Sequence, residues 1–456
     1  MSGAGEASKT PGHSNGSTGA LFGKLHPGPG SSPEQVASHQ RGRIYGAMIE
    51  LVSERGYGAV TVKELVRLAR VSKHTFYDHF DDKDECFCAT YEMLALRSIE
   101  RVEAAQTGCA DWQERLRLAF GAWAGGLASE PRAARVALVE AFAGGPAALQ
   151  RMRHAEARFG TLIEQSFASA PDGIAVPPLV VQGIVAGMAR VARARLLAGR
   201  ERELADLADE MLEWVFCLRC EETAALGRLA GPVDAVAQSG EALAVKHEDD
   251  DRERILDAVG WLAAHEGYWQ LTIPRIRSVA GVSRKTFDAN FDDVQGAFTA
   301  TLERLTQRGL ALVRPARLAG QDWPGAIHRA LHALCGYVAA DPVFARLGFV
   351  EVFAPGPDGV RFRELMMTGL TEVFRASAPD AQRPPELAAQ ASVGAIWGIV
   401  HQHVAGGHAE LLPGVAGTLS FLALAPAIGA EQAVAAIVAE HARMRDGDAA
   451  GVGALA

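Results

Sequence analysis

Apolar residues along this chain follow the spacing of helices rather than the alternation of strands. Ser32 is placed to cap a first helix, and Pro33 suits its first turn. Apolar side chains then recur on one helical face: Ile44, Met48, Leu51 and Val52. Gly56 supplies a left-handed residue to end that helix. Because later segments rich in Ala and Leu are interrupted by Gly or Pro, as in antiparallel helices joined by short loops, we predict an all-α protein.

The sequence matches itself at a shift of 211 residues. The matching pairs include Arg43-Ile44 with Arg254-Ile255, Thr61 with Thr272, Val71-Ser72 with Val282-Ser283, Thr75-Phe76 with Thr286-Phe287, Phe80-Asp81-Asp82 with Phe291-Asp292-Asp293, and Trp112 with Trp323. A shared register over this length predicts an internal duplication, with units over 33–226 and 250–440.

Two segments lack the apolar residues that folding needs. The N-terminal tail, residues 1–31, is rich in Gly, Ser and Pro and cannot bury enough surface to offset the entropy of ordering. Between the two units, residues 229–250 contain a Gly-Pro pair and an acidic run that begins at Glu248. We therefore expect a disordered tail and a solvated linker.

Two short helices joined by a three-residue turn are predicted in the first unit. Thr61 starts the first of them in a capping box, and Leu65 and Leu68 are expected to face inward. Ser72 caps the second, which runs over residues 73–79. This is the helix-turn-helix arrangement, in which the second helix enters the major groove of DNA.

The second short helix carries hydrogen-bond donors and flat rings that suit base edges and phosphates. These side chains are Lys73, His74, Thr75, Tyr77 and His79. Asp81 and Asp82 then cap a long helix. Near its N-terminus, Lys83 and free backbone N–H groups are placed to hold a phosphate.

The charge around these helices supports binding to nucleic acid. The whole chain has 45 basic and 54 acidic residues, a net charge of −9, whereas residues 41–77 carry seven basic residues, Arg43 among them, against three acidic ones, a net of +4. A cationic patch on an acidic protein favours a phosphate backbone as its partner. A plain three-helix bundle with solvated charges would explain the apolar core, but not exposed Tyr77 and His79 beside clustered cations.

These residues carry a resemblance to a known family. The segment from Thr61 to Cys86, with Ala-x-Val-Ser, then Thr-Phe-Tyr-x-His-Phe and Lys83, resembles the DNA-binding domain of tetracycline-repressor-like (TetR family) regulators. One departure is Arg70, where the family usually has Gly in the turn. The resemblance implies two tandem units, each a three-helix DNA-binding domain followed by a helical half that binds a ligand and dimerises. The candidate DNA contacts are Arg43, Thr61, Lys73, His74, Thr75, Tyr77, His79 and Lys83.

The second unit keeps the pattern of the fold but loses residues that would contact DNA. Tyr77 is replaced by Asp288, His79 by Asn290 and Lys83 by Val294. A carboxylate at such a position repels phosphate, and Pro274 removes an N–H group that could meet one. The net charge of residues 252–288 is only +2, from six basic and four acidic residues. Weaker candidate contacts remain at Thr272, Arg284 and Lys285.

The repeat and the resemblance together predict the organisation of the chain. The expected regions are a tail (1–31), a helix-turn-helix domain (32–88), a helical regulatory domain (89–228), a linker (229–250), a degenerate helix-turn-helix domain (251–299) and a second helical regulatory domain (300–445). We expect a transcriptional regulator, in particular a repressor, whose partner is double-stranded operator DNA. The alternative is a sensor or scaffold that binds DNA weakly or not at all and acts through protein–protein contacts.

Small residues lie among apolar ones in both regulatory domains: Gly183, Gly187, Gly394 and Gly398. Helices with such residues can pack closely while leaving room for an apolar molecule. We expect a small apolar ligand in at least one unit, whose binding would release DNA by favouring a conformation with the wrong half-site spacing.

The resemblance also implies that units pair through a four-helix bundle. The helices expected to form it are 179–198, 201–226, 387–405 and 408–424, with apolar stripes at Val180, Ile184, Met188, Val191, Val393, Ile396, Trp397 and Val400. The linker is long enough for the units to pair within one chain as a pseudo-dimer that reads an asymmetric site. The alternative is a homodimer in which first units pair between chains and read a palindrome.

Other candidate chemistry is weak. His328 and His332 share one helix face, and further histidines follow at 401, 403 and 408, but without a third ligand we expect partly buried helix histidines rather than a metal site. The six cysteines are expected to be reduced thiols. Because no catalytic triad or glycine-rich phosphate loop stands out, we expect neither an enzyme nor a cofactor. With neither a membrane-spanning apolar stretch nor a secretion signal, we expect a cytoplasmic protein.

Overall fold

The computed structural model describes residues 32–229, 250–312 and 322–453, and every regular element in these ranges is a helix. The prediction of an all-α protein is confirmed. The predicted tail 1–31 and all but the ends of the predicted linker lie outside the described residues. We call residues 32–229 the first half and residues 250–453 the second half.

The first half opens with a three-helix domain, the first head (residues 33–80). The Ser32 hydroxyl accepts a hydrogen bond from the Gln35 N–H, and Thr61 and Glu64 form a capping box, so the predicted helix starts are present. The elements of this head are α1 (Pro33–Arg55), η2 (Tyr57–Ala59), α2 (Val62–Ala69) and α3 (Lys73–Tyr77).

The core of the first head is apolar and fully buried at Ile44, Met48, Leu65 and Phe76. The prediction that Leu68 faces inward is wrong, because its side chain is 45% exposed. Leu65 and Ala69 define the buried face of α2, and position 68 lies about 100° around the helix from position 69. At Gly56, φ is 77° and ψ is 156°, so this residue ends α1 with a positive φ but an extended ψ, not in the left-handed helical region.

Helix α4 (Lys83–Gln106) joins the first head to a helical bundle. The prediction of one helix over 201–226 is wrong, because this segment is divided into three pieces. The backbone is extended at Cys220, and the neighbouring Arg219 guanidinium pairs with Asp172. The bundle consists of α5 (Trp112–Ser129), α6 (Pro131–Leu138), η3 (Glu140–Gly144), α7 (Gly145–Ala168), α8 (Pro178–Leu197), η4 (Glu201–Leu204), α9 (Ala208–Phe216) and η5 (Glu221–Arg228).

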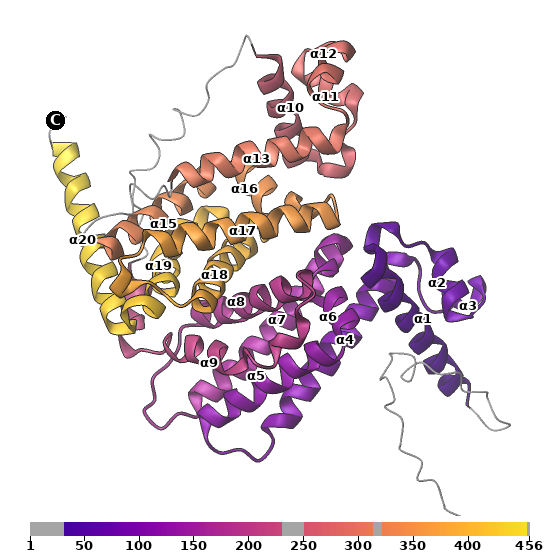
Figure 1. Ribbon diagram of the computed structural model, residues 1–456, viewed down its shortest axis with the longest axis horizontal. Helices are drawn as coiled ribbons and strands as arrows, with labels where there is room; N and C mark the ends of the chain where they lie inside the picture. The colour runs from indigo at the N-terminus through magenta and orange to yellow at the C-terminus, as the bar shows by residue number, and fades with distance from the viewer. Residues whose placement is uncertain (1–31, 230–249, 313–321, 454–456) are drawn as a thin grey trace, which may run out of the picture.

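The second half begins with the same order of elements. Its second head (residues 251–291) consists of α10 (Asp251–Glu266), η8 (Tyr268–Gln270), α11 (Ile273–Ala280) and α12 (Arg284–Asn290). The bundle that follows consists of α13 (Val294–Leu312), α15 (Trp323–Ala340), α16 (Pro342–Phe349), η9 (Glu351–Phe353), α17 (Pro357–Ser377), η10 (Asp380–Gln382), α18 (Glu386–Ala405), η11 (Ala409–Leu411), α19 (Leu412–Ile428) and α20 (Ala430–Gly453). Figure 1 shows the two heads projecting from the joined bundles, with α10 to α12 at the top and α1 to α3 at the right.

The two halves meet along α8 and α18, the most extensive helix pair in the described fold. Glycines permit this approach. A Cβ atom at Gly187 would lie 2.6 Å from the Ala391 carbonyl oxygen, and one at Gly398 would lie 2.4 Å from the Ala186 Cβ. The same contact includes Gly183 and Gly394. The close helix packing predicted at these four glycines is therefore confirmed, whereas none of the four lines the larger cavities within the two bundles.

The apolar stripe expected at this contact on α18 lies elsewhere. Its residues, Val393, Ile396, Trp397 and Val400, line a cavity inside the second half. On α8, Met188 lines a cavity of the first half, and the rest of the stripe, Val180, Ile184 and Val191, is buried in the core. Each of these helices faces both its own bundle and the other half, and the small residues mark the face toward the other half.

Helix α19 is unusually apolar. With η11 it forms the segment Ala409–Ile428, the one unbroken segment among the described residues that is long and apolar enough to cross a membrane; α15 with Pro342–Phe353 passes the same test only as a pair bent by 105°. In the fold this helix packs against α15, α18 and α20, and 61% of its most apolar window is buried. The burial accounts for its composition as that of a core helix.

Candidate DNA interface and ligand cavities

The turn between α2 and α3 is held in the left-handed conformation. Arg70 has φ 54° and ψ 45°, and it is the one non-glycine residue with positive φ in the described chain. The matching Gly281 has φ 66° and ψ 34°, so both heads build the same turn. Arg43 donates from Nη1 to the Arg70 carbonyl oxygen at 3.3 Å. This candidate DNA contact therefore also braces the turn that places α3.

Helix α3 presents a cationic and aromatic face. The Ser72 hydroxyl accepts from the Thr75 N–H at 2.9 Å and fixes the start of the helix, while Phe76 is fully buried beneath it. Tyr77 is 46% exposed, and the Lys73 Nζ lies 5.6 Å from the centroid of its ring. His74 is exposed beside Asp78. The structure thus brings together three predicted contacts, Lys73, His74 and Tyr77, on one exposed face.

Thr75 and His79 are less accessible than the sequence predicts. Both are only partly exposed, and the Thr75 hydroxyl contacts that of Ser72 at 2.9 Å. The His79 Nε2 lies 3.3 Å from the Gln40 Oε1 on α1. Burial lowers the pKa of His79 from its usual value, which favours a neutral ring. His79 is therefore positioned by α1 rather than held free for DNA.

Thr61 and Lys83 also have partners within the head. The Thr61 hydroxyl lies 2.7 Å from Glu64, and a hydrogen bond from Arg55 lowers the pKa of Glu64 to about 2, so the cap is ionised. Lys83 Nζ donates to the Tyr57 carbonyl oxygen at 3.2 Å and lies 4.1 Å from the centroid of the Tyr57 ring. Lys83 thus packs onto η2, and Tyr57 is a positioning residue whose role its sequence context alone does not indicate.

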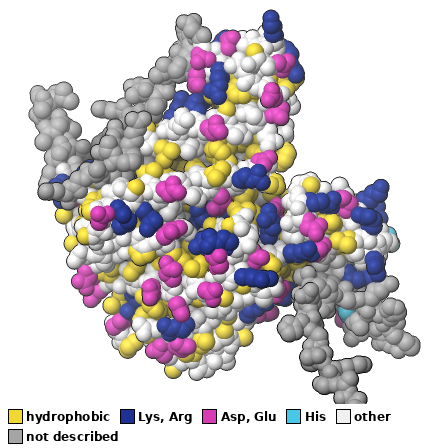
Figure 2. Space-filling model, in the orientation of Figure 1, with side chains coloured by type: hydrophobic (Ala, Val, Ile, Leu, Met, Phe, Trp, Pro, Cys, Tyr) yellow, Lys and Arg dark blue, Asp and Glu magenta, His cyan; other side chains and the backbone are white. Residues whose placement is uncertain are grey.

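Positive charge extends beyond α3. Exposed basic side chains lie on the first head at Arg41, Lys63, Arg67 and Arg70. Figure 2 shows Lys and Arg side chains gathered around the outer end of this head, at the right of the view. This distribution matches the cationic patch expected from the sequence and is suited to a phosphate backbone.

The second head has the same skeleton with a neutralised surface. Ser283 caps α12 and Phe287 is fully buried, as at the matching positions of α3. Arg284 Nε, however, donates to the Asp288 carboxylate at 2.8 Å, so the charge of this candidate contact is balanced by its neighbour. Thr272 stands at the N-cap of α11 without a side-chain cap bond. Of the three candidates in this head, Lys285 is the one exposed cation without a neutralising partner on its helix.

The predicted histidine pair lies in a larger cluster. His328 and His332 are buried rather than partly buried, and the ring of His441 on α20 lies 5.7 and 6.3 Å from their centroids. His401 is buried and contacts the Phe349 carbonyl oxygen through Nδ1, at 2.6 Å. Among the described residues, no group of three or more His, Cys, Asp or Glu side chains is arranged to hold a metal ion.

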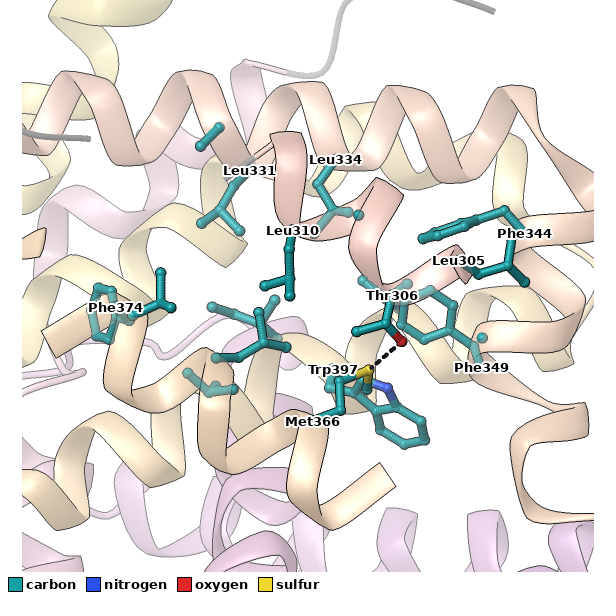
Figure 3. Close-up of a pocket in the computed structure, with 18 of the residues that line it drawn as sticks. Leu305, Thr306, Leu310, Leu331, Leu334, Phe344, Phe349, Met366, Phe374 and Trp397 are labelled. Atoms are coloured by element: carbon teal, nitrogen blue, oxygen red, sulfur yellow. Dashed lines mark hydrogen bonds between the residues drawn. The ribbon is translucent and has the colours of Figure 1, made fainter. Parts of the chain in front are cut away.

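Each half encloses a cavity between its helices. The cavity of the second half is about 170 Å³ in volume and is lined by apolar and aromatic side chains, with no charged residue among them. Figure 3 shows labelled residues of its wall: Leu305, Thr306, Leu310, Leu331, Leu334, Phe344, Phe349, Met366, Phe374 and Trp397. The first half has one cavity of about 80 Å³ with Gln106, Glu156 and Arg193 in its wall, and a second of about 90 Å³ with Arg97, Arg101 and Glu130 in its wall. The cavities of the two halves therefore differ in size and in polarity.

A pair of matched contacts connects each head to the junction of the halves. The Tyr57 N–H donates to Glu140 Oε2 at 3.1 Å, and the Tyr268 N–H donates to Glu351 Oε2 at the same distance. Two residues beyond these glutamates, the rings of Phe142 and Phe353 stack with centroids 4.2 Å apart. Burial raises the pKa of Glu140, which the Tyr57 N–H partly offsets. The two heads are thus tied to a single aromatic stack between the halves.

One segment of the chain matches a known family model. Residues 44–90 match the family model described as "Bacterial regulatory proteins, tetR family". No curated protein sequence matches the chain.

Similar solved structures are regulators. The fatty acid degradation regulator FadR from Bacillus halodurans aligns at 16% identity with a TM-score of 0.35, over 38% of this chain and 95% of its own. FadR from Bacillus subtilis, in complex with stearoyl-CoA, aligns at 18% identity with a TM-score of 0.35 over the same shares. A TetR-like transcriptional regulator from Rhodococcus sp. RHA1 aligns at 21% identity with a TM-score of 0.34, over 39% of this chain and 96% of its own.

Proposed function

We propose that the chain is a non-enzymatic, cytoplasmic transcriptional regulator whose first head reads operator DNA. The match of residues 44–90 to the tetR family of bacterial regulatory proteins supports this proposal. The observation that carries the proposal is the exposed pair on α3, Lys73 and Tyr77, held on a helix that buried Phe76 anchors. The second helix of such a motif lies in the major groove, so these side chains meet base edges and phosphates there.

The candidate contacts divide into two groups. Lys73, His74 and Tyr77 are exposed and would meet DNA directly, with His74 lying 3.6 Å from Asp78. The other candidate contacts already have partners within the head and mainly hold α3 in position. Their N–H groups or charges would lie near the phosphates of the DNA. These residues are Arg43, Thr61, Thr75, His79 and Lys83.

A mobility-shift titration of the full chain with the DNA that flanks its own coding region tests this assignment. Lys73→Ala is expected to weaken binding across sequences and to reduce the dependence of affinity on salt by roughly one phosphate contact. Arg202→Ala, which removes one exposed positive charge from η4, outside the first head, is the matched control. Equal binding by wild type and Lys73→Ala at every salt concentration would exclude the assignment.

We propose further that the halves are tandem copies of one unit that pair within the chain. The contact of α8 with α18 and the matched bonds at Tyr57 and Tyr268 support this pseudo-dimer. One competent and one neutralised head would read an asymmetric operator, since operator symmetry mirrors protein symmetry. Light scattering that gives the mass of one chain, with DNA protection on one side of the site, supports the pseudo-dimer; twice that mass with two symmetric half-sites supports the homodimer.

A small apolar ligand is proposed to act on DNA binding through the second-half cavity. Phe349, Val352 and Trp397 belong to the wall of that cavity. Val352 directly follows Glu351, which accepts a hydrogen bond from the Tyr268 N–H. Phe353 stacks on Phe142 across the junction. Ligand that expands the cavity would shift this stack and the spacing of the heads, and so release DNA, as a repressor requires.

The alternative function, a sensor or scaffold that acts through protein contacts, is favoured only by the second head. There the Arg284–Asp288 pair removes a free charge, and Trp269 is 76% exposed. Absence of DNA binding by the wild-type chain at low salt, together with retained ligand binding, would favour this alternative.

A further inference from the structure

We infer that the second-half cavity is a site for an uncharged, largely apolar molecule with one hydrogen-bond acceptor, which the indole N–H of Trp397 binds. Any effect of this molecule on DNA binding rests on the proposed function. The binding site itself is argued from the cavity alone.

The cavity excludes charge. None of the side chains that line it is ionisable, and its wall is formed almost wholly by carbon atoms of Leu, Ile, Val and Phe side chains. An ion moved from water into such surroundings loses its hydration without a partner. The volume of about 170 Å³ suits a compact ligand, since an apolar cavity of about 150 Å³ in another protein holds benzene.

Two polar side chains reach the wall, and one of them is already satisfied. The Thr306 hydroxyl donates to the Leu302 carbonyl oxygen at 2.9 Å and also lies 3.8 Å from the Met366 sulfur. Its single hydrogen is therefore in use within α13. Thr306 offers a ligand no free donor.

The Trp397 indole is the exception. Its Nε1 is buried and has no hydrogen-bond partner among the described residues, and the side chain is 6% exposed. Buried indole N–H groups normally find a partner. Two other buried tryptophans do so here: Trp214 donates to Ser392 at 3.2 Å, and Trp323 donates to Ser377 at 3.0 Å.

The ring of Trp397 is held in place, so it cannot turn to another acceptor. His401 stacks on it at 4.9 Å with planes only 10° apart, and the Arg363 guanidinium lies 4.1 Å from its centroid. The Phe353 ring meets it edge-on at 5.6 Å. A ligand in the cavity would therefore supply the missing acceptor. It would bind to the Trp397 ring, which contacts Phe353, and Phe353 stacks on Phe142 of the other half.

Figure 3 shows the indole nitrogen on the side of the ring that faces Met366 and Thr306. The Met366 thioether belongs to the same wall and is flexible, with three rotatable bonds. Because the nitrogen is covered in this structure, the ligand reaches it when Met366 changes rotamer.

Three probes of nearly equal shape and size separate the contributions. Acetophenone carries a carbonyl acceptor, cumene has an isopropyl group in place of the acetyl group and so lacks an acceptor, and benzoate carries a negative charge. Binding to the full chain is measured by calorimetry or competition without DNA, so that failure of this inference is distinguished from failure of the proposed DNA binding, which the mobility shift reports.

The decisive quantity is the ratio of acetophenone affinity to cumene affinity. Trp397→Phe keeps an aromatic ring but removes the N–H, and is expected to lower this ratio roughly three- to tenfold. Thr306→Val, the matched control at the other polar wall position, is expected to leave the ratio within about twofold of wild type. Benzoate is expected to bind at least tenfold more weakly than acetophenone.

A second variant keeps the test decisive if Trp397→Phe does not fold. Met366→Ala uncovers the indole nitrogen and is expected to raise the same ratio, whereas Ala330→Leu fills the cavity and should abolish binding of both neutral probes. An unchanged ratio in Trp397→Phe or in Met366→Ala, benzoate binding as tight as acetophenone, or no binding of either neutral probe to wild type would overturn the inference.

Discussion

In the first head, α3 carries exposed Lys73 and Tyr77 above a fully buried Phe76. In the second head, α12 carries Arg284 and Asp288 above an equally buried Phe287, and these two side chains neutralise each other. Both heads have a serine cap and a left-handed turn, so the folds agree while the surfaces differ. The skeleton of this motif therefore depends on a few buried and capping residues, which place no demand on the residues that would touch DNA.

The two bundles also differ, but here the second half has the feature suited to binding a partner. The half with the neutralised head encloses the larger cavity, about 170 Å³ against about 80 and 90 Å³, and its wall carries no charge. The half with the cationic head has Glu156 and Arg193 in one of its smaller cavities. This asymmetry supports a division of work in which the first half reads DNA and the second half responds to a ligand.

The largest expected effect comes from removing the surface of one head at a time. Lys73→Ala combined with Tyr77→Ala is expected to weaken DNA binding by about 2–4 kcal/mol, because a charged and a hydrogen-bonding contact are both lost. The matched pair in the second head, Arg284→Ala with Asp288→Ala, removes no net charge and should change affinity less than about threefold. Equal losses from the two pairs in a mobility-shift titration would show that the heads contribute alike.

The contact between the halves can be broken at a glycine. Gly187→Val would force a side chain against the Ala391 backbone, where even a Cβ would lie 2.6 Å from the carbonyl oxygen. We expect a loss of about 3 kcal/mol in the free energy of unfolding, as for overpacking in a core. Gly121→Val on α5 is the control, because a Cβ at Gly121 meets nothing within 4 Å and helix propensity alone should change stability by less than about 1 kcal/mol. Denaturant titration of both variants measures the difference.

Acid should destabilise the second half in particular. Burial lowers the pKa of His328 to about 4, with its neighbours His332 and His441 contributing. The unfolded chain takes up this proton near pH 6.5 and the folded chain does not, so stability is lost as pH falls from about 6.5 toward 4. For His328 alone, we expect a loss of about 2 kcal/mol between pH 7.5 and 5.

The variant His328→Gln tests whether His328 causes this loss of stability in acid. The Ser420 hydroxyl donates to the Ala416 carbonyl oxygen, so it accepts from His328 Nδ1–H at 2.9 Å, and a glutamine amide can replace that donor. The stability of the variant should depend less on pH than that of wild type. The first half has Arg117 at the matching position, so Arg117→Gln should leave the pH dependence unchanged.

The sequence predicts the parts of this molecule that depend on local chemistry. Caps at Ser32, Thr61 and Ser72 and the turn at Arg70 are present because each is decided within a few residues of the chain. The buried Phe76 and the cationic face of α3 follow from helical spacing in the same way. Local sequence was therefore enough to predict the helix starts and the turn of the first head, but not the exposure of Leu68, Thr75 and His79.

The arrangement of α18 was not predictable by the same reasoning. Its glycines and its apolar stripe lie on different faces, and the sequence alone does not tell which face meets the other half. The expected roles were therefore exchanged: Gly398 packs against Ala186 of the other half, while Trp397 and Val400 line the cavity. The Tyr57 partner of Lys83 was missed for a related reason, since η2 approaches the start of α4 only after the chain folds.

The smallest expected effect is a gain. Position 288 on α12 matches Tyr77 on α3, so Asp288→Tyr gives the second head the same side chain there. The substitution also frees the Arg284 guanidinium from its ion pair. The second head would then present a cation and a ring in the arrangement that Lys73 and Tyr77 have on α3. We expect DNA affinity to rise by about 1 kcal/mol, the size of one added hydrogen bond together with a freed charge.

The same variant should also change the length and symmetry of the DNA site that the chain protects. If the second head approaches DNA in the pseudo-dimer, protection by Asp288→Tyr extends to a second half-site, and the preferred sequence becomes more symmetric. Asp288→Ala is the control, because it frees Arg284 without adding a ring or a hydroxyl, and it should give only the part of the gain that charge supplies. A footprint that stays on one side in both variants would mean that the pseudo-dimer holds the second head away from DNA, whatever side chains α12 carries.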